Sequence, residues 1–147
     1  MEAERALSLR PETLFFLDGI GFLMTLMGGW ERGSTLIRKV MQLNPFYGKY
    51  VHFSLWVNCI RQKDYADAYQ KILKFNSPEL FLDHVARAST LGLLGNIEDG
   101  REAAAELIKL KPDFAERGRL LIRHYIKFDD IVERVIKGLN AVGIKVR

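Results

Sequence analysis

The side chains that most often carry catalysis or bind metals are few in this sequence and widely spaced. His52, His84 and His124 fall in different parts of the chain, and Cys59 is the only cysteine. An active site needs titratable groups that converge, and the sequence offers no such set. A lone cysteine cannot complete a Cys-x-x-Cys metal site or an intramolecular disulfide, which also favours a reducing compartment. We therefore expect no enzyme activity, no bound metal and no cofactor.

The pair Asp83 and His84 comes closest to a catalytic arrangement. Adjacent residues on a helix project about 100° apart, so they cannot grip one ligand together as residues four apart can. A structural, hydrogen-bonding role for His84 is the favoured interpretation. Residues 91–100, LGLLGNIEDG, lack the lysine and the preceding strand of a phosphate-binding loop, which excludes that motif.

The composition is that of one folded domain. The chain has 147 residues, 48% hydrophobic and 27% charged, which is ordinary for a globular protein and enough for one core. Its net charge of +4 is too small to argue for an anionic partner by itself. The longest apolar stretch, residues 14–27, is shorter than the about 20 residues that cross a bilayer, and the N-terminus does not resemble a signal peptide. We expect a cytoplasmic protein that does not enter a membrane.

Four prolines divide the sequence into units of nearly equal length. They lie 34, 33 and 34 residues apart, and proline both ends one helix and suits the first turn of the next. Small side chains at matching positions let paired helices approach closely, so each unit is predicted to be two antiparallel helices. The prolines are Pro11, Pro45, Pro78 and Pro112, and the small residues at fixed offsets from the last three are Gly21, Gly33, Ser54, Ala66, Ala88 and Gly100.

Local patterns predict where the helices turn. Gly95 and Asn96 interrupt two amphipathic stretches in the third unit, and Gly28 and Gly29 do the same in the first. The second unit departs from the frame by two residues, so we expect a shortened second helix or an altered turn there. Its inward residues would then be Tyr65, Ala68, Ile72 and Phe75.

These features resemble the tetratricopeptide repeat (TPR) family, from about Ala3 to Pro112. The matching positions in the third unit, the best of the three, are Ala88, Leu91, Gly95, Gly100, Leu107 and Pro112. The resemblance implies an all-α fold, a right-handed superhelix of helical hairpins. It places a remnant of a truncated repeat at residues 1–11 and repeats at residues 12–45, 46–78 and 79–112 of a single domain that spans residues 1–147.

A narrower resemblance concerns the second half of the chain. Residues 81–95 and 112–144 are similar to the C-terminal repeat region that follows the catalytic domain in some bacterial class III adenylate or guanylate cyclases. Similar regions follow the DNA-binding domains of some bacterial regulators. The resemblance implies that the chain belongs to a longer bacterial signalling or regulatory protein, whose activity would lie in another domain.

The repeat pattern stops after the last proline, and two further helices are predicted at residues 113–125 and 129–142. Asp129 is placed to cap the second and Gly143 to terminate it. We expect residues 113–147 to form a pair of capping helices at the open end of the stack. Their basic residues offer a nucleic-acid surface as an alternative function, which is less favoured because no stacking aromatics alternate with them. These residues are Arg117, Arg119, Arg123, Lys127, Arg134, Lys137, Lys145 and Arg147.

The favoured functional candidate is the concave groove, which the first helix of each repeat lines in the tetratricopeptide family. The groove would be mainly apolar and would suit an apolar protein segment or helix, which makes the chain a protein-binding or oligomerisation module. Residues 14–27 are apolar nearly all round, so we also expect a homodimer through this segment. The predicted groove residues are Phe15, Asp18, Phe22, Thr25, Val51, Leu55, Asn58, Leu82, Val85 and Ser89.

Overall fold

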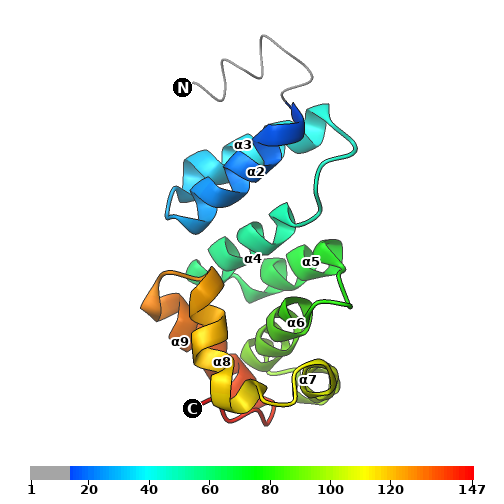
Figure 1. Ribbon diagram of the computed structural model, residues 1–147, viewed down its shortest axis with the longest axis vertical. Coiled ribbons are helices and arrows are strands. Elements are labelled where there is room, and N and C mark those ends of the chain that lie inside the picture. Colours follow the sequence, from blue (N-terminus) through cyan, green and yellow to red (C-terminus); the bar gives the residue numbers. More distant parts are fainter. Residues whose placement is uncertain (1–13) are drawn as a thin grey trace.

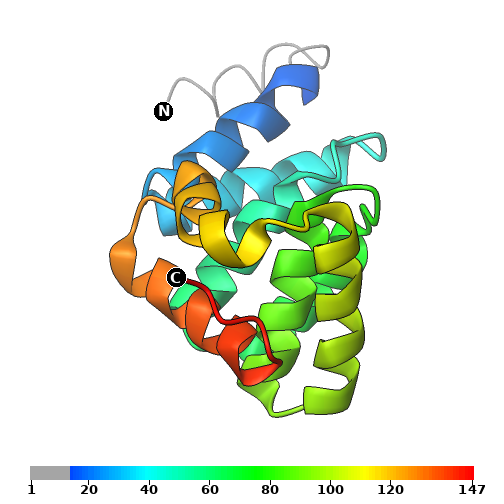
Figure 2. The same ribbon diagram turned by 60° about the horizontal axis from the view of Figure 1, so that its bottom comes forward.

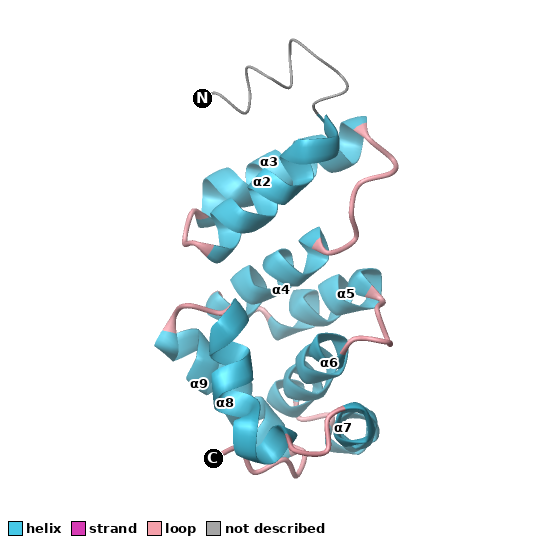
Figure 3. Ribbon diagram, viewed as in Figure 1, coloured by secondary structure: helices cyan, strands magenta, loops and turns pink. Residues whose placement is uncertain are grey.

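The structure is a computed structural model that describes the backbone of residues 14–147 and the side chains from Phe16 onward. Over this range the chain is helical without strands, as Figure 3 shows, which confirms the all-α prediction. The predicted remnant at residues 1–11 and the side chain of Phe15 lie outside the described residues. The helices are α2 (Leu14–Leu26), α3 (Trp30–Leu43), α4 (Val51–Arg61), α5 (Tyr65–Phe75), α6 (Phe81–Leu94), α7 (Ile97–Leu110), α8 (Phe114–Tyr125) and α9 (Asp129–Ala141).

The first six of these helices form three hairpins that coincide with the proline-bounded units. Helices α2 and α3 pair within residues 12–45, α4 and α5 within residues 46–78, and α6 and α7 within residues 79–112. Successive hairpins are stacked along the long axis of the molecule (Figure 1), with α2 resting on α4 and α5 on α6. The proline spacing therefore predicts the helical pairs correctly.

Small residues lie where the paired helices cross. A Cβ atom added to Gly33 would be 3.0 Å from the carbonyl oxygen of Gly21, and one added to Gly21 would be 3.3 Å from the carbonyl oxygen of Gly33. In the third hairpin a Cβ on Gly100 would make only an ordinary contact with the Cβ of Leu91, at 3.4 Å, but it would overlap the side chain of Val142 at the end of α9. The α2–α3 crossing therefore requires its two glycines, as their spacing predicts, whereas Gly100 is small because of Val142 and not because of its partner helix.

The predicted turns are also present. Gly28 and Gly95 end α2 and α6 with φ angles of +98° and +82°, a region that glycine adopts without steric cost. The second helix of the middle unit, α5, has 11 residues against 14 for α3 and α7, and Asn76 ends it with a φ of 38°. Its shortening confirms the predicted departure of this unit from the repeat frame.

The two C-terminal helices form at the predicted residues but do more than close the end of the stack. Helix α9 packs against α6 and also reaches α4, and Figure 2 shows it alongside the third hairpin. The predicted cap at Asp129 is wrong, because Phe128 occupies the N-cap position and no side chain caps this end. Gly143, with a φ of +97°, follows α9 as predicted.

One continuous apolar core joins α4 to α9, and two smaller clusters lie beneath α2 and α3. The α2–α3 turn is fixed to the C-terminal pair by the rings of Trp30 and Phe128, whose centroids are 5.2 Å apart. A second aromatic contact, between Phe22 and Tyr50 at 5.1 Å, joins α2 to the start of α4. Two aromatic contacts therefore attach the first hairpin to the rest of the molecule.

Candidate functional site

Most of the predicted groove residues are buried, which corrects the expectation that they line an open surface. Only Phe22 and Leu82 remain partly exposed among those whose side chains are described. A buried side chain can support a binding surface but cannot contact a partner. The buried members are Asp18, Thr25, Val51, Leu55, Asn58, Val85 and Ser89.

Two parts of the fold cover these residues. Val51 and Leu55 pack with Ile37 of α3, so the first hairpin lies over them. Ser89 lies beneath α9, where a Cβ on Gly138 would be 2.8 Å from the carbonyl carbon of Ser89. The sequence could not reveal this, because the positions facing α9 carry the same apolar and small residues that a free groove would carry.

Helix α9 is fastened to α4 by a polar contact as well as by its apolar face. The guanidinium of Arg134 donates hydrogen bonds to the carbonyl oxygens of Ile60 and Arg61, at 2.9 and 3.2 Å. These carbonyls belong to the last turn of α4, where a positive charge is favourable. Arg134 therefore has a structural role. Its charge, which the sequence suggested for a basic surface on the capping helices, serves to attach α9 to α4.

An apolar pocket remains open at the N-terminal ends of α4 and α6, and we call it the aromatic pocket. It has a volume of about 270 Å³ and includes both of the predicted groove residues that are still exposed. Aromatic and leucine side chains from α2, α4, α5, α6 and α8 converge there. The lining residues are Phe22, Tyr50, Phe53, Phe75, Leu80, Phe81, Leu82 and Tyr125.

The rings of the aromatic pocket hold one another in place. Phe53 lies at the centre, with its ring centroid 5.8 Å from that of Phe75 and 6.2 Å from that of Tyr125. Phe22 meets Tyr50 edge to face. Such pairs add about 0.5–1.5 kcal/mol beyond the burial of area, so the lining is ordered before a ligand arrives.

A buried carboxylate positions the rim of the aromatic pocket. Asp18 of α2 accepts hydrogen bonds at 2.8 Å from the hydroxyl of Tyr50 and from the backbone N–H of Gly48. Burial and the hydrogen bond to Asp18 raise the pKa of Tyr50 to about 12. Asp18 thus ties the 44–50 connection to α2 and orients the ring of Tyr50.

The predicted groove does not include six residues of the pocket, all of which lie at or near the ends of helices. Tyr50 immediately precedes α4, Leu80 immediately precedes α6, and Phe75 is the last residue of α5. The predicted groove residues were taken from one face of the first helix in each repeat, so they could not include residues at the ends of other helices or between helices. The available signal was the concentration of large apolar side chains at helix ends, where polar capping residues are more usual.

Within the described residues, no group of three or more histidine, cysteine, aspartate or glutamate side chains is placed to hold a metal ion. Burial raises the pKa of the Cys59 thiol to about 12, and the nearby carboxylate of Asp67 acts in the same direction. The thiol is therefore protonated at neutral pH and is a poor nucleophile. Burial also lowers the pKa of His52 to about 4, with further contributions from Lys74 and Lys71.

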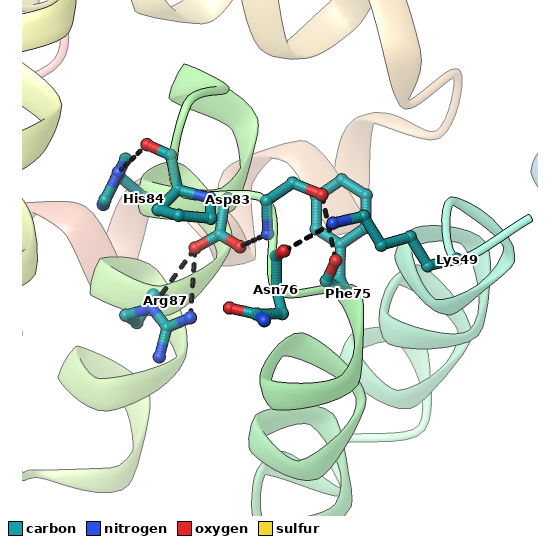
Figure 4. Close-up of polar contacts among 8 residues, drawn as sticks. Lys49, Phe75, Asn76, Asp83, His84 and Arg87 are labelled. Carbon is teal, nitrogen blue, oxygen red and sulfur yellow. Dashed lines mark hydrogen bonds and ion pairs between the residues drawn. The ribbon is translucent and has the colours of Figure 1, made fainter.

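Asp83 and His84 both tie α6 to the preceding connection, as Figure 4 shows. The carboxylate of Asp83 is fully buried, accepts a hydrogen bond from the backbone N–H of Ser77 at 2.7 Å and pairs with Arg87 at 3.2 Å. His84 bonds through Nε2 to the carbonyl oxygen of Pro78 at 2.8 Å. The predicted hydrogen-bonding role of His84 is confirmed.

The basic residues of α8 and of the connection that follows it are largely engaged with neighbouring carboxylates and carbonyls. Arg119 pairs with Glu133 and Arg123 with Asp129, and the ammonium of Lys127 donates to two carbonyls in the last turn of α8. These contacts reduce the positive charge available to a phosphate backbone. The nucleic-acid alternative gains no support from them.

The comparisons with known proteins leave the family open. No protein-family model matches the chain, and neither a curated protein nor a solved structure matches it. None of the described helices is long and apolar enough to cross a membrane.

Proposed function

We propose that this chain is a non-catalytic module of tetratricopeptide type that binds an apolar segment of another protein at the aromatic pocket. The observation that carries the proposal is the pocket itself, in which eight apolar side chains from five helices and their connections converge. Pockets lined in this way accept large apolar side chains, and an amphipathic helix presents such side chains from one face.

Two features of the pocket support a protein ligand. Phe22 of α2 and Leu82 of α6 both line the pocket while remaining partly exposed, so both can be buried further by a ligand. The ring contacts around Phe53 order the site in advance, which lowers the entropic cost of binding. Binding energy in such interfaces concentrates in a few central side chains.

A peptide selection tests the proposal. Peptides selected from a displayed random library against the purified chain should carry large apolar anchors and should lose about tenfold or more in affinity for the Phe22→Ala and Leu82→Ala variants, because truncating a central contact costs over about 1 kcal/mol. Leu120→Ala is the matched control, since Leu120 is 68% exposed on α8 and does not line the pocket.

Two outcomes would contradict the proposal. One is a selection that yields no binding peptide. The other is a peptide whose affinity is unchanged in both pocket variants while their circular dichroism spectra match that of the unmodified chain. Loss of affinity in Leu120→Ala as well would locate the binding surface elsewhere.

The setting we propose is a larger bacterial signalling or regulatory protein in the cytoplasm. It rests on the similarity of residues 81–95 and 112–144 to the repeat regions of class III cyclases. The alternative, a regulatory region of a nucleotide cyclase in particular, is tested by the coding sequence that precedes Met1. An open reading frame there without a cyclase domain would remove that alternative.

A second candidate function, self-association through residues 14–27, is favoured by a specific observation. Three large apolar side chains of α2 and that of Met27, the residue that follows the helix, are exposed, and their spacing of four, three and four residues is that of one helix face. They carry no charge to repel a second copy. They are Phe16, Ile20, Leu23 and Met27, with exposed fractions of 73%, 41%, 60% and 73%.

A further inference from the structure

The connection between the first and second hairpins carries the most exposed large apolar side chain of the described residues. Phe46 is 83% exposed, and Leu43, the last residue of α3, is 57% exposed. Neither residue lines the aromatic pocket. Large apolar side chains that gather on a surface mark a contact with another macromolecule or with a membrane.

The same part of the chain carries positive charge without negative charge. No aspartate or glutamate occurs between Glu31 and Asp64. Arg38 and Lys39, near the end of α3, and Lys49, in the connection, are all exposed. The excess charge of the molecule is therefore concentrated beside the exposed apolar side chains.

The end of α5 adds to this charge in space. Lys49 donates a hydrogen bond at 2.8 Å to the carbonyl oxygen of Asn76, the residue that follows α5 (Figure 4). Burial lowers the pKa of His52, and the positive charge of Lys74 contributes, so this exposed lysine lies near the start of α4. Figures 1 and 2 both show the connections that precede α4 and follow α5 on the same side of the molecule.

These segments form one surface, which we call the basic edge and define by five residues. Residues 38–50 and 71–80 together hold five basic residues and a single acidic one, Glu79. The surface therefore combines an apolar tip with surrounding positive charge. Its defining residues are Arg38, Leu43, Phe46, Lys49 and Lys74.

We propose that the basic edge binds the surface of an anionic lipid bilayer. Anionic lipids attract basic residues within a Debye length of the headgroups. Exposed apolar side chains then enter the boundary between headgroups and acyl chains, a contact that requires no segment to cross the membrane. In this arrangement Phe46 and Leu43 are inserted, and the basic residues contact lipid phosphates and carboxylates.

The apolar tip favours a lipid surface over a nucleic acid. Single-stranded nucleic acids are held by several aromatic rings on which successive bases stack. The basic edge has one aromatic ring, Phe46, and its other apolar member, Leu43, has no ring face. A bilayer accepts both side chains, because insertion depends on the apolar area that leaves water and not on ring geometry.

Co-flotation of the full chain with lipid vesicles tests the proposal. The chain should float with vesicles of two parts phosphatidylcholine to one part phosphatidylserine, and added salt should weaken this binding. It should bind vesicles of phosphatidylcholine alone at least about tenfold more weakly, because the attraction between opposite charges is absent.

Two variants remove the two parts of the basic edge separately. Phe46→Ser should lower the affinity for the anionic vesicles by about tenfold, since one large apolar side chain no longer leaves water. Arg38→Gln/Lys74→Gln should lower the same affinity by about tenfold or more, since each basic residue near an anionic surface contributes to binding.

Matched controls make the same kinds of change elsewhere on the surface. Leu120→Ser replaces an apolar side chain that is 68% exposed on α8, and Arg101→Gln/Lys137→Gln removes two exposed charges from α7 and α9. Neither control should weaken vesicle binding to a comparable extent. All of the substituted side chains are exposed, so the circular dichroism spectra of the variants should match that of the unmodified chain.

Phe46→Trp reports on insertion directly. When the phosphatidylcholine of the anionic vesicles carries bromine on its acyl chains, the fluorescence of the introduced indole should be quenched. The unmodified chain serves as the blank, because Trp56 is fully buried and Trp30 packs against Phe128.

Several results would overturn the proposal. They are the absence of vesicle binding, equal affinity for vesicles with and without phosphatidylserine, unchanged affinity in Phe46→Ser, an equal loss in the controls, or no quenching in Phe46→Trp. Binding of single-stranded polythymidylate but not of vesicles would assign the basic edge to nucleic acid instead. Loss of a dimer in Phe46→Ser without vesicle binding would assign it to an interface between copies.

These results are separable from binding at the aromatic pocket. None of the five residues of the basic edge lines that pocket. Phe22→Ala should therefore bind vesicles as the unmodified chain does, and Phe46→Ser should keep the affinity for peptides that bind at the pocket.

Discussion

The indole Nε1 of Trp56 donates a hydrogen bond to the hydroxyl of Thr90 at 2.7 Å across an interval of 34 residues. The two residues occupy the same position in consecutive units, because each stands at one offset from the proline that ends its unit, Pro78 or Pro112. Both are fully buried. Equivalent positions of α4 and α6 therefore meet directly, which ties the register of one unit to that of the next.

Removing this hydrogen bond should measure how tightly the units are coupled. Trp56→Phe truncates a buried ring and leaves the Thr90 hydroxyl without its donor, so the free energy of unfolding should fall by about 2–4 kcal/mol. Thr90→Val should cost less, about 1–2 kcal/mol, because the Trp56 N–H loses one acceptor while the packing is kept. Urea denaturation monitored by circular dichroism measures both.

The double variant Trp56→Phe/Thr90→Val supplies the control. If the hydrogen bond forms as the structure shows, the double variant should lose about 1 kcal/mol less free energy of unfolding than the sum of the losses in the two single variants. The reason is that the bond can be lost only once. Strict additivity would mean that the two side chains do not interact in solution.

A close approach between the backbones of α6 and α9 predicts a large effect for a small substitution. A Cβ on Gly138 would lie 2.8 Å from the carbonyl carbon and 2.9 Å from the Cα of Ser89, and backbone atoms cannot move aside cheaply. Gly138→Ala should therefore lower the free energy of unfolding by about 3 kcal/mol. Gly95→Ala, where a Cβ would meet nothing within 4 Å but φ is +82°, should cost only about 1–2 kcal/mol. Comparable midpoints for the two variants in guanidinium would show that α9 does not sit against α6 as described.

His52 should make the protein less stable in acid. Its side chain is 2% exposed and its pKa is lowered to about 4, mainly by burial, against an unfolded value of about 6.5. Between these two pKa values His52 binds a proton in the unfolded chain but not in the folded chain. The contribution of His52 to the free energy of unfolding therefore rises with pH through this window and is constant above it.

The His52→Gln variant isolates this contribution. Between pH 7 and pH 4.5 the unmodified chain should lose about 2 kcal/mol more of its free energy of unfolding than the variant does. Equal losses in the two chains would show that His52 is not buried in the neutral form. Carboxylate titration affects both chains alike, so the difference between them reports on His52.

The sequence allowed the helical pairs to be predicted because their determinants are local and periodic. Proline ends each unit, and Gly21 and Gly33 are small because the helices that carry them touch. The aromatic pocket was only partly predictable: Phe22 and Leu82 follow from helix periodicity, whereas Tyr125 enters the pocket through the path of α8. That path depends on how α9 packs against α6, a tertiary preference that no repeat frame encodes.

The exposed face of α2 gives a direct test of self-association. Leu23 is 60% exposed within a stripe that also includes Phe16 and Met27, and an exposed apolar stripe of this length is unusual in an isolated monomer. Sedimentation velocity across the micromolar range should show a concentration-dependent dimer. Leu23→Glu should abolish the dimer, since a second copy would have to bury an unpaired charge.

The control is Thr35→Glu, at an exposed position of α3, which should not affect the dimer. The free energy of unfolding of both variants should lie within about 0.5 kcal/mol of that of the unmodified chain. A strictly monomeric chain at high micromolar concentration, or a Leu23→Glu variant that dimerises as well as the unmodified chain, would refute self-association through residues 14–27.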